Sequence, residues 1–174
     1  MSKKKKPKIL LLVDFENLFI NVRDEIPPEK FSIEGGFNRV IRAITEEVGE
    51  IVGVFAFLPS DRALVWDKDL YELQFNIVLC PRIKNKEGVE KDTTDSRLLE
   101  LGEWLINHLE LSHVFIGSGD KDFSPLMKKA AQKGLKKGVV AANLKSLSSK
   151  LIQLTDTNPS TGKKMVYLFS PIEE

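Results

Sequence analysis

The chain of 174 residues is 42% hydrophobic and 29% charged, and its 26 basic and 25 acidic residues leave a formal net charge of +1. This length fits one domain, which can bury roughly two-thirds of the surface of its unfolded chain. The near-neutral balance excludes a global electrostatic field for nucleic acid, so such a partner would have to be recognised by local charge.

Cysteine and histidine are scarce, which limits disulfide formation and zinc binding. Cys80 is the sole cysteine, which excludes an internal disulfide and fits a reducing, cytoplasmic environment. With His108 and His113 it supplies too few ligands for a zinc site. No apolar run approaches the ~18 residues that cross a membrane. We expect a disordered basic tail over residues 1–7 and a single domain over residues 8–174.

Apolar runs alternate with stretches of helical spacing along the chain. The first run, Ile9–Val13, has no polar alternation, which is typical of a strand buried on both faces of a parallel sheet. Residues 19–37 contain Pro-Pro and Gly-Gly pairs and predict an irregular segment. The elements expected after it are a helix over 37–48, a strand over 51–58, a helix from Asp61 to about residue 73, a strand over 75–80, a basic loop over 82–91, a helix from 92 to about 109, a strand over 114–117, a helix over 124–133, a strand over 139–142, a short helix within 146–154 and an edge strand over 165–169.

This alternation of strands and helices predicts the fold class. We expect a three-layer α/β/α domain in which a mainly parallel sheet carries helices on both faces. The connections between its parallel strands should be right-handed crossovers.

Three of the predicted elements carry an aspartate at equivalent positions. Asp14 ends the first strand, Asp120 follows the fourth, and Asp95 lies in the first turn of the helix after the third. If the first and fourth strands are neighbours in a doubly wound sheet, a crevice opens between their carboxyl ends. Clustered carboxylates repel one another unless a cation shares the site, and such oxygen ligands suit Mg²⁺ or Mn²⁺. The pattern predicts a metal-dependent site that hydrolyses phosphodiesters.

Each of these residues also has a structural interpretation. Asp95 is either a ligand or an acid that stabilises a helix N-terminus, and Asp92, three residues earlier, is an alternative ligand. Asp122 is favoured as a helix cap over a metal ligand. Asn17 and Ser118 fit turn and cap roles as well as contacts to a phosphate or an aspartate.

Other site chemistries fit the sequence less well. Gly117-Ser118-Gly119 lacks the third glycine of a dinucleotide-binding motif. A phosphatase of the haloacid dehalogenase kind needs Asp-x-Asp after the first strand, where this chain has Glu16 as the second acid. Glu16 and Glu100 are interpreted as solvated charges.

Three sequence blocks resemble the NYN domain of the LabA-like type, within the PIN-like nuclease superfamily. Val13–Leu18 is similar to the first-strand motif, in which Asn follows Asp by three residues. Lys91–Leu98 is similar to the central block, although it reads Asp-Thr-Thr-Asp where many relatives have Lys-Gly-Val-Asp. Gly117–Leu126 matches the Ser-Gly-Asp-x-Asp-Phe-x-Pro-Leu block. The departure in the central block leaves the choice between Asp92 and Asp95 open.

The resemblance implies a five-stranded parallel sheet of order 3-2-1-4-5 and an endoribonuclease that depends on Mg²⁺ or Mn²⁺. It also implies that Asp14, Asp95 and Asp120 are metal ligands. Asp122 is a fourth acid, and Asn17 and Ser118 are supporting polar groups. A catalytically weak module that binds RNA or protein on the same fold is the alternative function, and a homodimer is left open.

Lysines supply the charge that an RNA substrate would need. Arg82, Lys84, Lys86 and Lys91 precede the helix of Asp95, while Lys121, Lys128 and Lys129 follow Asp120. Single-stranded RNA crossing the acidic crevice would use such basic banks, with Lys91 and Lys121 nearest to it. The stacking candidates near the motifs are Phe15, Phe19 and Phe123, which also fit the hydrophobic core.

Overall fold

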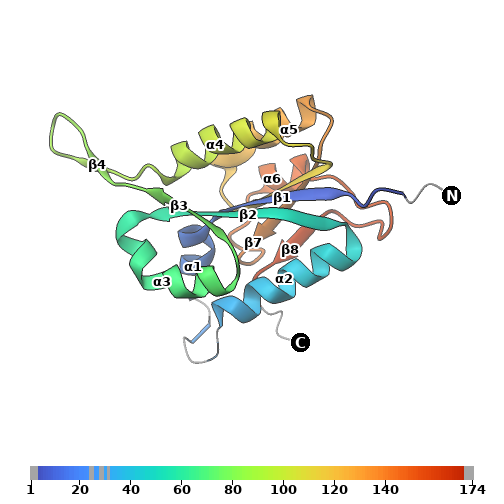
Figure 1. The fold of residues 1–174 in the computed structure, drawn as a ribbon, viewed down its shortest axis with the longest axis horizontal. Helices are drawn as coiled ribbons and strands as arrows, with labels where there is room; N and C mark the ends of the chain where they lie inside the picture. Colours follow the sequence, from blue (N-terminus) through green and yellow to red (C-terminus); the bar gives the residue numbers. More distant parts are fainter. Residues whose placement is uncertain (1–3, 24–25, 28–29, 31, 171–174) are drawn as a thin grey trace.

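A six-stranded sheet with strand order β3-β2-β1-β6-β7-β8 forms the centre of the computed structural model, and every pairing within it is parallel (Figure 1). The structure describes residues 4–23, 26–27, 30 and 32–170. Its first five strands in chain order give the predicted order 3-2-1-4-5, and β8 adds a sixth at the edge. The strands are β1 Lys8–Asp14, β2 Glu50–Pro59, β3 Asn76–Cys80, β6 His113–Gly117, β7 Lys136–Ala141 and β8 Val166–Leu168.

Helices cover both faces of the sheet, as Figure 1 shows. The helices on one face are α1 Phe15–Arg23, α2 Ile33–Glu47 and α3 Ser60–Glu72. Those on the other are α4 Thr94–His108, α5 Ser124–Gln132 and α6 Ser149–Leu154. The protein is therefore a three-layer α/β/α domain, as the alternation of elements predicts.

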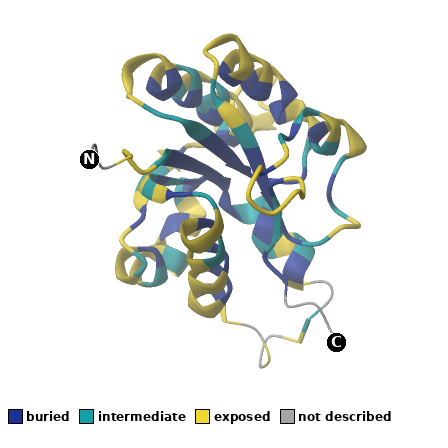
Figure 2. Cartoon of the chain, turned by 90° about the vertical axis from the view of Figure 1, so that its right-hand side faces the viewer, coloured by how far each residue is buried: buried dark blue, intermediate teal, exposed yellow. Residues whose placement is uncertain are grey.

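β1 lies at the centre of the core. Its alternate residues face opposite layers, because side chains along a strand point to opposite faces. Leu11 is packed with the helices of the first layer and Leu12 with those of the second, and both are fully buried. Figure 2 shows this buried sheet between helices whose outer surfaces are exposed. The unbroken apolar run before Asp14 is the sequence consequence of burial on both sides.

The irregular segment predicted between β1 and β2 is wrong at both of its ends. The sequence predicts an irregular segment over 19–37, but α1 extends to Arg23 and α2 begins at Ile33. The helix α2 starts early because Ser32 caps it, with its Oγ accepting a hydrogen bond from Gly35 N at 3.0 Å. A serine cap outweighs the glycines that follow it. The Pro27-Pro28 pair falls partly outside the described residues.

The segment over 82–91 also differs from the predicted loop. Two short antiparallel strands, β4 Ile83–Lys84 and β5 Glu90–Lys91, form a hairpin. The helix predicted from Asp61 is α3, which begins at Ser60, so Asp61 lies in its first turn and Pro59 is at the N-cap position.

Parts of the domain prediction remain predictions. Residues 4–7 belong to no helix or strand, although Pro7 O accepts a hydrogen bond from Glu50 N at 2.9 Å. Residues 1–3 of the predicted tail lie outside the described residues. Among the described residues, no helix has the length and apolar composition that crossing a bilayer requires.

Candidate metal centre

The site lies between β1 and β6, where the strand order of the sheet changes direction. β1 is flanked by β2 on one side and β6 on the other, and the chain leaves β1 and β6 toward opposite sides of the sheet. A crevice at the carboxyl ends of two such strands is where open α/β sheets bind ligands. Asp14 is the last residue of β1, and Gly117 is the last residue of β6.

Asp14 is a buried carboxylate. It is 7% exposed, and its Oδ1 accepts a hydrogen bond from Asn17 N at 3.3 Å. The pKa of Asp14 is raised from its usual value of 3.8 to about 7, mainly by burial; the hydrogen bond from Asn17 lowers it, and the charges of Asp95, Asp92 and Glu16 add smaller upward contributions. Removing a carboxylate from water disfavours its charged form, and like charges add to this cost. The electrostatics of the site therefore call for a cation.

Asp120 shapes the turn after β6. Its backbone N–H donates to Ser118 Oγ at 3.1 Å, and Ser118 is fully buried. Asp120 is the N-cap of the short 3-10 helix η2 (Lys121–Phe123), with its Oδ1 accepting from Asp122 N at 2.9 Å. The prediction that Asp122 is the cap is therefore wrong, because the cap is Asp120. The Asp122 carboxylate is free of that structural role.

The N-terminus of α4 brings in two further acids. Asp92 Oδ1 accepts from Thr94 N at 2.8 Å, and Asp92 Oδ2 lies 3.6 Å from Arg82 Nη1. Asp92 thus holds the start of the helix and has a cationic partner. Asp95 lies in the first turn of α4, and burial followed by the charges of Asp120, Asp92 and Asp122 raises the pKa of Asp95.

Asp95, Asp120 and Asp122 form one acidic group, with a carboxylate oxygen of each within 4.8 Å of the others. Asp14 is outside this group but is coupled to Asp95 by charge. An all-oxygen donor set of this spacing fits a hard divalent cation such as Mg²⁺ or Mn²⁺. The residues present therefore fit a metal ion.

Asn17 and Gly119 connect the two walls of the crevice. Gly119 N donates to Asn17 Oδ1 at 3.3 Å, which joins α1 to the turn after β6. Gly119 also has no room for a side chain, because an added Cβ would lie 2.1 Å from the backbone oxygen of Ser146. Asn17 and Ser118 thus organise the backbone around the acids.

Two features of the site are not apparent from the sequence pattern. The first is the segment after β7, where Ser148 N donates to Gly119 O at 2.9 Å and Ser146 packs on Gly119. This loop also follows the carboxyl end of a strand, a topological signal that could have indicated it. The second is Glu16, which the sequence suggests is solvated but which pairs with Arg62 at 3.3 Å and raises the pKa of Asp14.

The residues predicted to contact substrate include exposed lysines and buried aromatic side chains. Lys91 and Lys121 are exposed, next to Asp92 and Asp120 in the chain. Phe15 and Phe123, considered for base stacking, are at most 1% exposed and belong to the core, and Phe19 packs against Phe15. Stacking of bases on the rings of Phe15 and Phe123 is therefore excluded.

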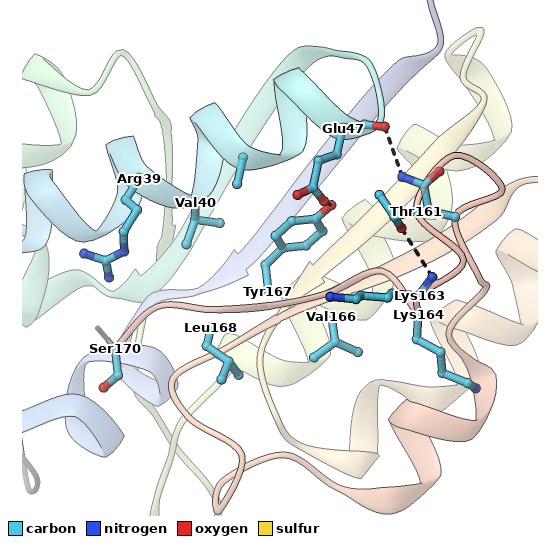
Figure 3. A pocket seen from close by; sticks show the side chains of 12 residues that line it. Arg39, Val40, Glu47, Thr161, Lys163, Lys164, Val166, Tyr167, Leu168 and Ser170 are labelled. Atoms are coloured by element: carbon cyan, nitrogen blue, oxygen red, sulfur yellow. Dashed lines mark hydrogen bonds between the residues drawn. The ribbon is translucent and has the colours of Figure 1, made fainter. Parts of the chain in front are cut away.

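A separate pocket of about 750 Å³ lies between α2 and β8, away from the acidic group (Figure 3). Its polar side chains are largely paired within the protein. Tyr167 donates its hydroxyl to Glu47 Oε2 at 2.6 Å, Asn158 Nδ2 donates to Glu47 O at 3.0 Å, and Arg39 donates to Phe169 O. The pocket therefore presents few free polar groups to a ligand.

The doubly wound parallel sheet with carboxylates at its carboxyl edge defines a PIN-like nuclease domain. The model of the NYN domain matches residues 8–158, and the chain belongs to the NYN domain family. That match covers all three motif blocks and both walls of the crevice.

A solved structure shows the same fold over nearly the whole chain. The crystal structure of a protein of unknown function from Vibrio parahaemolyticus has a TM-score of 0.73 and 22% identity, covering 97% of this chain and 95% of that chain. The crystal structure of MurG from Acinetobacter baumannii is less similar, with a TM-score of 0.47 and 12% identity, covering 95% of this chain and 46% of that chain. The comparison with curated proteins gave no match.

Proposed function

We propose that this protein is a metal-dependent ribonuclease, an endoribonuclease that uses Mg²⁺ or Mn²⁺. The observation that carries the proposal is the gathering of Asp95, Asp120 and Asp122 within 4.8 Å beside the buried Asp14. Membership of the NYN domain family suggests a nuclease, and the acids are the residues that such chemistry requires. A module that only binds a polyanion would gain nothing from clustered negative charge.

The acids take distinct roles in this proposal. Asp95 and Asp120 would hold the metal ion together with Asp14, which lies outside their group but near enough to Asp95 for their charges to interact, and Asp122 would be the fourth acid. When bound, such an ion lowers the pKa of a water molecule and neutralises charge on the phosphate oxygens. Asp92 is not needed as a ligand, because it already accepts a hydrogen bond from Thr94 N at the start of α4 and pairs with Arg82.

The remaining groups hold the acids in place. The Asp122 N–H orients one carboxylate oxygen of Asp120, and the Ser118 hydroxyl fixes the Asp120 backbone. Asn17 keeps the turn after β6 against α1 through Gly119. Lys121 and Lys91 are exposed beside the acids and would attract the phosphate backbone of single-stranded RNA.

The test is cleavage of labelled single-stranded RNA by the purified protein with Mn²⁺, with EDTA, and by the variant Asp120→Asn. This variant keeps an oxygen that can accept from Asp122 N but removes the charge, so the turn should survive. We expect cleavage with Mn²⁺, none with EDTA, and a loss of at least about 100-fold in the variant. Cleavage that persists in EDTA or in the variant would refute the mechanism.

A circular RNA substrate separates the modes of attack, because it has no ends. Cleavage of the circle by the wild type would support endonucleolytic action. Tight binding of RNA without cleavage at any metal concentration would instead favour a binding module on the same fold. Mn²⁺ should also raise the melting temperature of the wild type but not of Asp120→Asn, since a ligand that binds the folded state stabilises it.

A further inference from the structure

The hairpin of β4 and β5, called the arm and comprising residues 82–91, projects beyond the N-terminus of α4 (Figure 1). It begins just after the carboxyl end of β3 and ends at Lys91, next to Asp92. Because β1, β2 and β3 are parallel, this is also the end of the sheet that carries Asp14 and the acidic group. The arm therefore stands beside the proposed metal centre.

Hydrogen bonds hold the base of the arm to the body of the protein. The Thr93 hydroxyl donates to Pro81 O at 2.6 Å, joining the two ends of the arm. Arg82 Nε lies 3.3 Å from Asp61 Oδ1, and Arg82 Nη1 lies 3.6 Å from Asp92 Oδ2. These ion pairs join Arg82 to both α3 and the start of α4. The arm is fixed to the helix that presents Asp95.

The tip of the arm is also structured. Asn85 N donates to Val89 O at 2.9 Å, and Asn85 Oδ1 accepts from Glu87 N at 3.0 Å and Val89 N at 2.9 Å. Gly88 has a φ of 78°, a conformation that a glycine adopts without strain. A surface organised in this way loses less conformational entropy when it binds a partner.

One face of the arm combines apolar groups with positive charge. Ile83 is paired with Lys91, and Asn85 is bonded to Val89, so Ile83, Val89 and Lys91 share one face by the alternation of side chains in strands. Ile83 is 55% exposed and Val89 is 59% exposed. Neither belongs to the hydrophobic core, so their apolar surface is open to a partner.

Lysines lie on both faces of the arm: Lys91 shares the face of Ile83, whereas Lys84 is paired with Glu90 and lies on the opposite face. Lys84, Lys86 and Lys91 are all exposed, and within the described part of the chain none of them forms an ion pair. Glu87 and Glu90 lie among these lysines, but the four basic residues of the arm outnumber its two acids, and the acids of the crevice do not pair with the lysines. A polyanion that crosses the crevice would supply the missing negative partner. The positive charge of the arm is therefore complementary to the phosphates of the proposed RNA substrate.

The geometry points to the arm as a substrate clamp, whose lysines contact phosphates while Ile83 and Val89 contact unpaired bases of single-stranded RNA. A duplex hides its bases and would leave the apolar face exposed to water, so the single strand is the better fit. This inference rests on the ribonuclease function proposed above and adds a binding surface to it.

The first test uses Lys84→Ala/Lys86→Ala, with Lys133→Ala/Lys136→Ala as the charge-matched control. The control lysines lie at the end of α5 and the start of β7, at the opposite end of the strands. Fluorescence anisotropy in EDTA measures binding of a single-stranded oligoribonucleotide at several salt concentrations. We expect the arm variant to bind roughly tenfold more weakly, with a salt slope shallower by about 1.4, or about 0.7 for each phosphate that a lysine no longer neutralises. Unchanged binding would overturn the inference.

A small phosphodiester separates the arm from the chemistry. Bis(p-nitrophenyl) phosphate is too short to reach the arm, so the arm variant should hydrolyse it at the wild-type rate while its kcat/KM for RNA falls about tenfold or more. If the wild type cleaves neither substrate but its RNA binding still depends on the arm, the ribonuclease proposal fails and the arm stands. If the wild type is active and the arm variant is unchanged, the arm alone fails.

The apolar face is tested by Ile83→Ser/Val89→Ser. This variant should lose affinity for single-stranded RNA several-fold and keep the weaker affinity of the wild type for a duplex of the same length. An equal loss for both would overturn the assignment of this face to unpaired bases. A dimer of the wild type that this variant abolishes, together with unchanged RNA binding, would assign the face to a second copy and refute the clamp.

Discussion

Asn17 and Gly119 are 102 residues apart in sequence, yet the Asn17 Oδ1 atom accepts a hydrogen bond from Gly119 N at 3.3 Å. The bond joins the element after β1 to the turn after β6, and these carry Asp14 and Asp120. The same Asn17 donates its backbone N–H to Asp14. Asn17 therefore fixes the position of Asp14, at the end of β1, relative to Asp120, in the turn after β6.

Asn17→Ala should weaken the site more than the fold. Gly119 is buried, so its N–H loses its partner, and we expect a loss of roughly 1–2 kcal/mol in the free energy of unfolding. RNA cleavage should fall by more than tenfold, beyond what the unfolded fraction explains. The control is Asn21→Ala, which removes a side-chain bond to Asn17 O on the same helix and should leave cleavage unchanged. Equal activity losses in the two variants would contradict this prediction.

The buried Asp14 should make the metal-free protein less stable as the pH rises. With a pKa of about 7 in the folded state against a usual 3.8, Asp14 keeps its proton on folding between these values. The unfolded chain releases that proton, so the free energy of unfolding falls as pH rises from about 4 to about 7 and stays low above that. The full effect is at most about 4 kcal/mol.

Asp14→Asn removes this dependence. In EDTA, the variant should gain stability over the wild type at pH 8 and show a much smaller gain at pH 4.5, as measured by urea denaturation. The exposed Asp67→Asn on α3 is the control and should show no such difference. A gain for Asp14→Asn that is independent of pH would show that the carboxylate is not the source.

Asp92 and Asp95 should separate stability from activity. Asp92→Ala loses the acceptor of Thr94 N and should cost about 1 kcal/mol in the free energy of unfolding while leaving cleavage within a few-fold of the wild type. Asp95→Asn relieves repulsion by Asp120 and Asp122, so metal-free stability should stay equal or rise while cleavage falls at least about 100-fold. Thermal unfolding in EDTA and initial cleavage rates measure the two effects. If Asp92→Ala abolishes cleavage and Asp95→Asn leaves it intact, Asp92 is the ligand.

Gly119→Ala should disrupt the site through the backbone. The added methyl group would lie 2.1 Å from Ser146 O, so either the loop after β7 or the turn of Asp120 has to move. We expect a loss of roughly 2–4 kcal/mol in the free energy of unfolding and little remaining cleavage. Gly35→Ala in the first turn of α2 is the matched control, because its nearest atoms lie at 3.4 Å and alanine favours a helix. Similar effects from both substitutions would contradict the close approach at Gly119.

The prediction of an irregular segment where α1 lies is wrong for a physical reason. Asp14 ends a strand and Phe15 begins a helix with no intervening turn, so the sequence shows none of the Gly or Pro signals that mark such a boundary. The helix is stabilised instead by Phe15, Leu18 and Val22, which are buried against the sheet. The hairpin of the arm is not predicted for a related reason, since strands of two residues carry too little alternation to be recognised.

The sequence by itself determined the class of fold and the gathering of aspartates at one edge of the sheet. Unbroken apolar runs such as Ile9–Val13 require burial on both faces, and this dictates a parallel sheet covered by helices. Aspartates placed after those runs then collect at one edge, because parallel strands all end there. Local pattern was sufficient for both conclusions.

Tertiary structure decided which acids lie together and which make hydrogen bonds to the backbone. Asp120 and Asp122 lie two residues apart, and only the backbone geometry after β6 makes Asp120 the cap of η2 and leaves Asp122 in the acidic group. Asp92 accepts a hydrogen bond from Thr94 N and pairs with Arg82, whereas Asp95 belongs to the acidic group. The bonds at Asp120 and Asp92 are local, but the gathering of Asp95 with Asp120 and Asp122 joins segments that are far apart in the sequence, and it exists only once the chain has folded.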